Sequence, residues 1–365
     1  MALETIATLI LGGLAFWWGM RLGRVLLRRG ATANDLFKGK TSVSLLFLGL
    51  YVALMALALH VPQLQALPLA WRVSGMQVTW TILRIILLGF CGLTFVVSWK
   101  TARLQVVAIA LIGILGLTAF TAAERYFLAP IYPYLEDNLQ PNGIYEQTSN
   151  SSCAPSALAT VLHRWGLKET ESSMARLAGT SLLGTSMPQL AVATKAIGMD
   201  AIELSPTWEQ MQRINRPGVL STWLYSEGGR DHHAVALVAL TKDSATVADP
   251  AFGKYFQVSR QQFDRIWRNE YLAVFRPQDI VLTAQQTADF LARSNYFPES
   301  SGVRGNGAGD HTTLTAAIRQ FQKDMGIPAT GVVNPLTALL LTGPFLTQVP
   351  TLNQPIDANL LIPTE

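Results

Sequence analysis

Cysteine is scarce in this sequence. Only Cys91 and Cys153 occur among 365 residues, and Cys91 lies in a long apolar run whereas Cys153 lies in a polar segment. We therefore expect no disulfide between them, and the sequence excludes a disulfide-stapled fold. Cysteine and histidine are never paired at zinc-binding spacings, so no metal ion and no cofactor are predicted.

Charged residues are also few. They make up 14% of the chain, whereas hydrophobic residues make up 50%. The sequence contains no GxxxxGK[ST] phosphate loop, so nucleotide binding and ATPase activity are not predicted. Beyond residue 130 no basic stripe alternates with aromatic residues, and the net charge of +4 includes arginines of the N-terminal region. Nucleic-acid binding is therefore not predicted either.

The hydrophobic excess is concentrated in residues 1–125. A first apolar run that is followed by arginines, rather than by a small-residue cleavage site, is expected to be retained as a span. The sequence thus predicts a four-helix transmembrane region with a lipid bilayer around it. Its apolar stretches, each close to the ~20 residues that a membrane-spanning helix needs, are 5–27, 43–61, 78–98 and 104–122.

Basic residues predict the orientation of these spans. Arginine and lysine follow the first and third stretches, and such segments remain on the cytoplasmic side. We therefore expect the N-terminus and everything beyond about residue 123 to lie outside the cytoplasm. Arg84, inside the third stretch, leaves two alternatives: a side chain that snorkels to the interface, which we favour, or a functional intramembrane charge.

Residues 126–277 have the pattern of a separate domain. A segment rich in proline and aromatic residues, 126–146, leads into it. Helical patterns come first and short apolar strand patterns follow, an order that indicates an α+β fold with an antiparallel sheet. The predicted helices begin after Cys153, at 171 and at 187, and the predicted strands cover 217–225, 233–240, 244–249 and 271–275.

Cys153 is the most informative residue of the chain. It follows a polar turn and precedes an amphipathic pattern in which Leu158, Val161 and Leu162 share one face. Pro155 suits the first turn of a helix, so we expect Cys153 at a helix N-terminus. Unpaired backbone N–H groups and the helix dipole stabilise a thiolate there, and the thiolate is the nucleophilic form of cysteine.

A cysteine nucleophile needs a base and a group that orients the base. His233 begins a predicted strand and Asp249 ends the next one, so two antiparallel neighbours can bring them within hydrogen-bond reach. His232 projects from the other face of the same strand and remains an alternative base. Gln147, upstream of Cys153, offers a side-chain N–H to the oxyanion of a tetrahedral intermediate.

Residues from about 144 to 275 resemble the bacteriocin-processing, double-glycine leader peptidases and their papain-like relatives. The resemblance rests on the spacing of Gln147 and Cys153, on a histidine that begins a valine-rich strand, and on an Asp-Pro pair at 249–250. It implies a papain-like cysteine peptidase with Cys153 as nucleophile and His233 as general base and acid. Asp249 would orient the histidine, and Gln147 would donate to the oxyanion.

Residues 281–342 resemble the small three-helix peptidoglycan-binding domain. Segment 314–341 carries the match, because its apolar residues share a helix face and Gly326 supplies a left-handed helix end. The resemblance implies an all-α module that binds peptidoglycan, and the alternative is a helical module that packs against the peptidase domain. Residues 343–365, with four prolines and few charges, are predicted to form an irregular tail.

Together these features predict a multi-pass protein of the bacterial inner (cytoplasmic) membrane. Its peptidase and C-terminal domains would lie on the periplasmic or extracellular side, and its expected partners are a peptide or protein substrate and peptidoglycan. The related peptidases act on the cytoplasmic side, so leader cleavage is not carried over. Two alternatives remain open: a non-catalytic, wall-tethered sensor or scaffold, and an acyltransferase that uses the same three residues.

Overall fold

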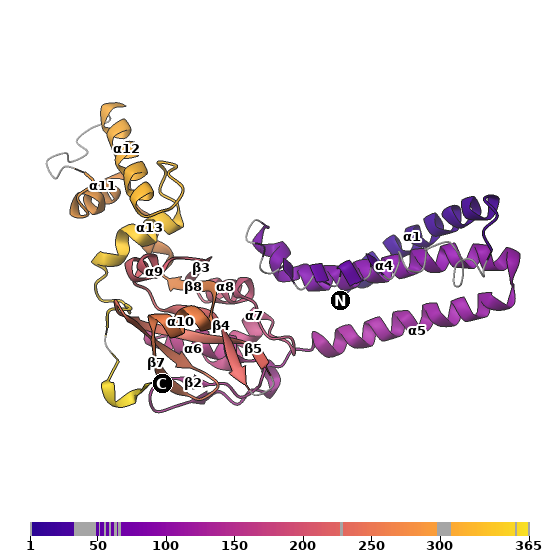
Figure 1. Cartoon of the computed structure of the whole chain (residues 1–365), viewed down its shortest axis with the longest axis horizontal. Helices are drawn as coiled ribbons and strands as arrows, with labels where there is room; N and C mark the ends of the chain where they lie inside the picture. Colours follow the sequence, from indigo (N-terminus) through magenta and orange to yellow (C-terminus); the bar gives the residue numbers. More distant parts are fainter. Residues whose placement is uncertain are drawn as a thin grey trace. The chain divides into compact units, whose positions relative to one another are not determined.

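The chain folds as two compact units, Met1–Ala129 and Pro130–Glu365 (Figure 1). The first contains apolar helices, and the second combines an α+β domain with further helices at its C-terminal end. The predicted multi-domain class is therefore confirmed at this level. The computed structural model describes residues 2–32, 67–226, 229–297, 308–354 and 356–363, with a few positions between 49 and 64.

Three helices of the first unit, within the residues described, are long and apolar enough to cross a membrane. They contain the first, third and fourth predicted stretches. The second predicted stretch, 43–61, lies largely outside the described residues. The helices are α1 (Ala2–Arg28), α4 (Leu69–Thr101) and α5 (Leu104–Phe127).

Glycines let α1 and α4 touch through their backbones. A Cβ atom added at Gly19 would lie 2.0 Å from the carbonyl oxygen of Gly89, and one added at Gly92 would lie 2.2 Å from that of Phe16. Neither position accepts a side chain without separating the helices. Small residues of this kind are typical of helix contacts inside a bilayer, where close backbone packing replaces the hydrophobic effect.

An ion pair joins α4 to α5. Arg84 Nη2 contacts Glu124 Oε2, and both side chains are largely shielded from solvent. Trp80 and Phe120 meet edge to face one turn away, with ring centres 6.1 Å apart. A carboxylate on the neighbouring helix thus neutralises the guanidinium, and the favoured snorkelling of Arg84 stays a prediction.

The second unit is built on a seven-stranded sheet in the order β3-β8-β4-β5-β6-β7-β9. Every neighbouring pair is antiparallel except β7 and β9, which are parallel. The four predicted strands are found in β4, β5, β6 and β8. The strands are β3 (Asp200–Leu204), β4 (Gly218–Ser226), β5 (Gly229–Leu240), β6 (Ser244–Asp249), β7 (Lys254–Ser259), β8 (Trp267–Phe275) and β9 (Leu361–Pro363).

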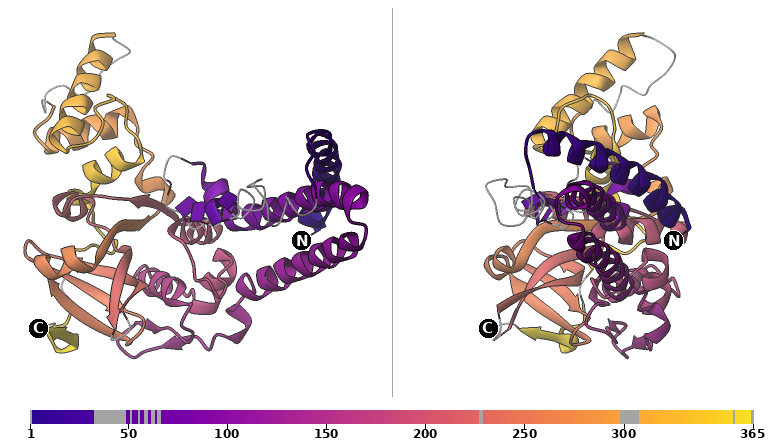
Figure 2. Two further views of the ribbon diagram at one scale, coloured as in Figure 1. Left: turned by 45° about the vertical axis from the view of Figure 1, so that its right-hand side comes forward. Right: turned by 90° about the vertical axis from the view of Figure 1, so that its right-hand side faces the viewer.

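Helices α6 to α8 lie to one side of this sheet, as both views of Figure 2 show in magenta. Helix α6 packs on β5 and β4, and its apolar face meets Val219, Ala234 and Ala236 in one core cluster. A two-stranded ribbon, β1 (Asn138–Leu139) with β2 (Tyr145–Glu146), precedes α6. The helices are α6 (Cys153–Arg164), α7 (Glu171–Ala178), α8 (Met187–Ala196), α9 (Trp208–Ile214) and α10 (Arg260–Ile266).

Three helices form the C-terminal module: α11 (Ala284–Arg293), α12 (Ala308–Asp324) and α13 (Pro335–Thr342). Gly326 follows α12 with a φ of +68°, as the sequence predicts. The module does not stand apart from the sheet. Its buried residues belong to the same core cluster as apolar residues of β4, β5, β6 and β8, among them Leu291, Phe321, Leu339, Leu220 and Tyr271.

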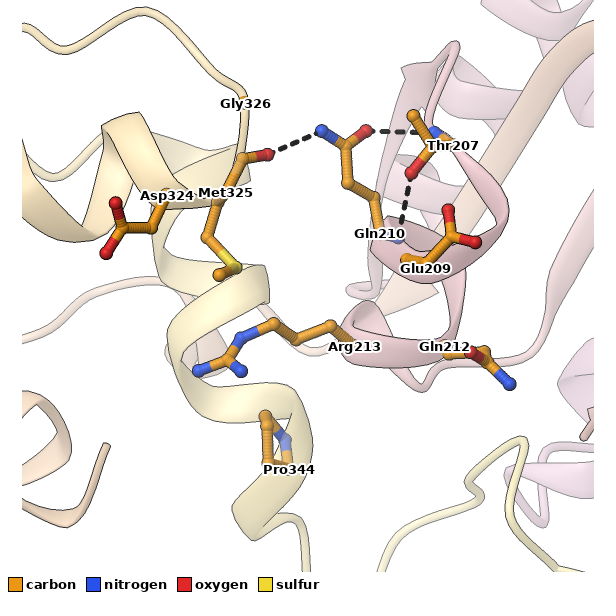
Figure 3. Close-up of a pocket in the computed structure, with 9 residues that line it drawn as sticks. All are labelled: Thr207, Glu209, Gln210, Gln212, Arg213, Asp324, Met325, Gly326 and Pro344. Carbon is orange, nitrogen blue, oxygen red and sulfur yellow. Dashed lines mark hydrogen bonds between the residues drawn. The ribbon is translucent and has the colours of Figure 1, made fainter. Parts of the chain in front are cut away.

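Polar contacts of α9 fasten this module to the sheet. Gln210 Nε2 donates to the Met325 carbonyl oxygen over 2.7 Å (Figure 3), and Arg213 Nε donates to that of Leu340 over 3.0 Å. Buried Asn215 donates to the Gly343 carbonyl oxygen and accepts from the backbone N–H groups of residues 352 and 353. The predicted alternative of a module packed against the peptidase domain therefore describes the arrangement found, whatever else the module binds.

The segment beyond residue 343 is more ordered than the predicted irregular tail. Its residues 352 and 353 are hydrogen-bonded to the side chain of Asn215. Its last described residues form β9, which pairs with Tyr255, Phe256 and Gln257 of β7. The physical reason is that β7 would otherwise expose a row of unpaired backbone groups at the sheet edge. Turns and two 3-10 helices, Gly343–Phe345 and Ala358–Leu360, lie in the described part of the segment before β9.

Candidate active site

Cys153 is the first residue of α6, as predicted. Ser152 occupies the N-cap position, and its hydroxyl bonds back to Ser149: it donates to the Ser149 carbonyl oxygen over 2.8 Å and accepts from the Ser149 N–H over 3.1 Å. These bonds close a tight turn in front of the helix. The thiol is free and half-buried, so it is both accessible and close to the unpaired N–H groups of the first turn.

The structure brings His233 of β5 and Asp249 of β6 together. His233 Nε2 lies 2.8 Å from Asp249 Oδ1, and both residues are buried. The same carboxyl oxygen accepts the Ala251 N–H over 2.8 Å, which fixes the carboxylate at the end of β6. Strand β6 ends where β5 reaches His233, so the imidazole lies at an open corner of the sheet.

Burial and hydrogen bonding act on His233 in opposite directions. Burial is the largest influence and lowers the pKa of His233, but hydrogen bonds with Asp249 and with Cys153, together with their negative charges, raise it to about 9. The imidazole is therefore protonated at neutral pH in this arrangement. Since Nε2 is held by Asp249, Nδ1 is the nitrogen left to face the thiol.

Gln147 connects the loop after Asp249 with the turn that precedes Cys153. Its backbone N–H donates to the Pro250 carbonyl oxygen over 2.8 Å, so it follows directly on the loop after Asp249. Its side-chain Nε2 donates to the Ser149 carbonyl oxygen over 3.1 Å, and its Oε1 is buried without a partner. One Nε2 hydrogen thus remains for a ligand at the start of α6.

His232 is not brought to Asp249. It is exposed, and its ring meets Trp223 with centres 4.8 Å apart. Burial and the charge of Arg268 lower the pKa of His232. Of the two histidines, His233 is therefore the one that is hydrogen-bonded to Asp249.

Glu171 is a site residue that the sequence did not reveal. Its fully buried carboxylate accepts the Thr148 N–H and the Thr148 hydroxyl, each over 2.8 Å, and so holds the loop that follows Gln147. A charged residue at the start of α7 reads as an ordinary helix-dipole partner in sequence. Only the structure shows that Glu171 binds the loop at Thr148.

No cluster of three or more metal-ligating side chains occurs among the residues that the structure describes. A pocket of about 580 Å³ opens at the junction of α9 with the C-terminal module, between Arg213, Asp324 and Pro344 (Figure 3). None of the predicted catalytic residues lines it.

Comparison with known proteins matches both parts of the second unit. Residues 142–279 match the profile of the peptidase C39 family, and residues 291–341 match that of a peptidoglycan binding domain. An uncharacterised protein of Methanothermobacter thermautotrophicus is 33% identical over 136 residues, which is 37% of this chain and 90% of that protein.

Solved structures show weaker similarity. The peptidase domain of Streptococcus ComA, a bi-functional ABC transporter of a quorum-sensing pathway, has 16% identity and a TM-score of 0.34, covering 37% of this chain and 98% of that one. A double-glycine motif protease from a PCAT transporter, solved with its leader peptide, has 20% identity and a TM-score of 0.30, covering 36% and 90%. The identity over nearly the whole archaeal relative and the two profile matches in succession lead to one conclusion: this chain belongs to the peptidase C39 family of cysteine peptidases and joins its peptidase domain to a peptidoglycan binding domain.

Proposed function

We propose that the protein is a membrane-anchored peptidase in which Cys153, His233 and Asp249 form the catalytic triad. The observation that carries the proposal is the 2.8 Å bond from His233 Nε2 to Asp249, beside the thiol at the start of α6. That bond fixes the ring so that Nδ1 faces Cys153. A protonated imidazole and a helix N-terminus both stabilise the thiolate electrostatically.

In the proposed reaction the Cys153 sulfur attacks the carbonyl carbon of a substrate peptide bond. The oxyanion that forms lies against the Cys153 N–H and the remaining Nε2 hydrogen of Gln147. His233 gives its Nδ1 proton to the leaving amine, and an acyl-enzyme results. His233 then takes a proton from water, which hydrolyses the thioester and releases the thiolate.

The apolar helices and the second domain support the location that we propose for this reaction. The candidate spans support anchoring in a bilayer, and the distribution of arginine and lysine supports an extracytoplasmic peptidase domain. The peptidoglycan binding domain supports the same side of the membrane. We propose a peptide or protein of the cell envelope as substrate, with no nucleotide required.

Thiol alkylation across pH tests the triad. The rate of iodoacetamide reaction with Cys153 should persist well below pH 8, where an ordinary thiol, with a pKa of about 8.5, is mostly protonated. His233→Ala should abolish the reaction below that pH. His163→Ala, which removes an exposed histidine on α6, is the matched control. An ordinary titration that is indifferent to His233 would contradict the triad and favour a non-catalytic module.

Gln147 provides a second test of the proposed reaction. Gln147→Ala should lower kcat by about 10²–10³-fold and leave KM nearly unchanged, because the bond to the oxyanion exists only in the transition state. Gln285→Ala, on the exposed side of α11, is the control. Equal losses in binding and turnover would place Gln147 in the architecture of the loop instead. Transfer of the acyl group to an added amine, in preference to water, would indicate an acyltransferase.

A further inference from the structure

A cluster of aromatic and basic side chains lies near the end of β4 and the beginning of β5. The Cζ atoms of Arg230 and Arg268 lie 4.4 and 4.6 Å from the ring centre of Trp223. The His232 ring packs edge to face on the same indole at 4.8 Å. Arg230 and His232 are exposed, whereas Trp223 and Arg268 are half-buried. We call these four residues the Trp223 cluster.

A bulge in β8 places Arg268 in this cluster. The β4–β8 pairing shifts between Ser221 and Thr222, whose partners are Glu270 and Trp267, so Arg268 and Asn269 are looped out. Asn269 takes a left-handed φ of 59°, and Arg268 Nη1 donates to Ser221 Oγ over 2.9 Å. A bulge beside a site commonly serves to re-aim a side chain.

The Trp223 cluster continues the sheet face on which α6 lies. The β4–β5 register is unbroken, so Trp223 and His232 share a face with Ala234 and Ala236, which pack under α6. Helix α6 begins at Cys153, next to His233. The cluster therefore lies on the part of this face that α6 does not cover, just beyond the helix start. His232 of the cluster directly precedes His233, the proposed base, in β5.

The guanidinium groups of Arg230 and Arg268 have N–H donors available for a ligand. Asp231 and Glu270 are the neighbouring carboxylates, yet no ion pair within 4.0 Å joins either to Arg230 or Arg268 in the described part of the chain. Stacking on an indole holds a guanidinium in place and leaves its in-plane donors available. Such a fork matches a carboxylate, to which it donates two parallel bonds.

We propose that the Trp223 cluster binds a carboxylate of the peptide substrate and so selects an acidic residue near the bond that is cleaved. This inference rests on the proposed function of Cys153. Because Asp231 and Glu270 balance the two arginines, recognition depends on contact with the guanidinium donors and not on a long-range positive field. One carboxylate is the ligand that fits, and a polyanion is not.

Selection from a peptide library tests the proposal without requiring cleavage. The full chain in detergent, carrying Cys153→Ala, is mixed with randomised octapeptides blocked at both ends, and bound peptides are identified by mass spectrometry. We expect enrichment of Asp or Glu at one position. Arg268→Gln and Arg230→Gln should each reduce it about tenfold, since a charge-assisted bond is lost. Arg268→Lys keeps the charge but loses the paired donors of the guanidinium, so its enrichment of acidic peptides should lie between those of the unchanged protein and Arg268→Gln.

Arg293→Gln is the matched control, because its exposed guanidinium stacks on Phe345 at 3.9 Å, outside the cluster. Absence of acidic enrichment, or equal loss in this control, would overturn the proposal. His233-dependent alkylation of Cys153 without acidic enrichment would leave the triad standing and remove the subsite. Acidic enrichment with inert Cys153 would keep the binding surface and remove the peptidase mechanism. Loss of enrichment together with a lowered melting temperature would make the arginines structural.

Discussion

His233 Nε2 lies 2.8 Å from Asp249 Oδ1, and this bond leaves Nδ1 as the ring nitrogen that is available to Cys153. The charge of Asp249 is also among the influences that raise the pKa of His233 to about 9, against the effect of burial. The pair therefore sets both the direction of the imidazole and its protonation state. Both consequences can be measured separately.

Asp249→Asn should separate the orientation of the His233 ring from its protonation state. Asparagine can keep a hydrogen bond to the ring but removes the negative charge, so the pKa of His233 should fall and less imidazolium should remain at neutral pH. We expect kcat to drop by about 10²–10⁴-fold, as for a triad carboxylate elsewhere, with slower alkylation of Cys153 below pH 8. Asp243→Asn, an exposed carboxyl in the turn before β6, is the control. An unchanged alkylation profile would refute this assignment.

Stability should depend on pH through the same histidine. A folded-state pKa raised from about 6.5 to about 9 stabilises the fold fully below pH 6.5. This contribution is lost as the pH rises through 9, and it amounts to roughly 3 kcal/mol. Urea unfolding of the Pro130–Glu365 unit should thus show a steeper loss between pH 6.5 and 9.5 than the same unit with His233→Gln. Parallel curves for the two proteins would contradict the raised pKa.

Asn215 should be a weak point of the second unit. Its side chain makes three hydrogen bonds to the C-terminal segment, and its φ of 52° is left-handed. Asn215→Ala should cost about 2–5 kcal/mol in the free energy of unfolding, since it loses the bonds and strains the backbone. Asn215→Gly keeps the backbone relaxed and should cost less. Equal losses in both variants would show that only the hydrogen bonds matter.

The Arg84–Glu124 pair leads to a prediction for the apolar helices of the first unit. Glu124→Gln leaves a guanidinium without its carboxylate in apolar surroundings and should destabilise the packing of α4 on α5 by about 3–5 kcal/mol. Replacing both partners with methionine should be close to neutral. Thermal unfolding in detergent measures each variant, with Arg125→Gln as control. A double variant as unstable as the single one would mean that the pair itself is required.

The sequence allowed much of the site to be predicted, because its contacts are local or follow from strand order. Cys153 lies at a helix start that Pro155 signals, and His233 and Asp249 belong to consecutive strands of one hairpin. Periodicity likewise identified the strongly apolar strands. The role of each residue in the reaction remains a prediction.

Other contacts could not be predicted, because they depend on distant parts of the chain. Strand β7 carries Lys254 and Gln257 among its six residues, and β9 ends in a proline, so neither has a strong strand pattern. Arg268 reaches Trp223 only through a bulge, whose position sequence periodicity does not indicate. Arg84 finds its partner on another helix, and a single apolar stretch contains no sign of it.

The core shared by the sheet and the C-terminal helices sets the order of events during synthesis. Leu220, Val235 and Tyr271 pack in one cluster with Leu339 and Leu352, so this core cannot close until residue 352 has been made. At the usual rates of 5–20 residues per second, roughly 200 residues beyond Cys153 take about 10–40 s to emerge. For that interval Cys153 is present in a chain that has not completed its fold, and the sheet that carries His233 and Asp249 becomes fully packed only after residue 352 has been made.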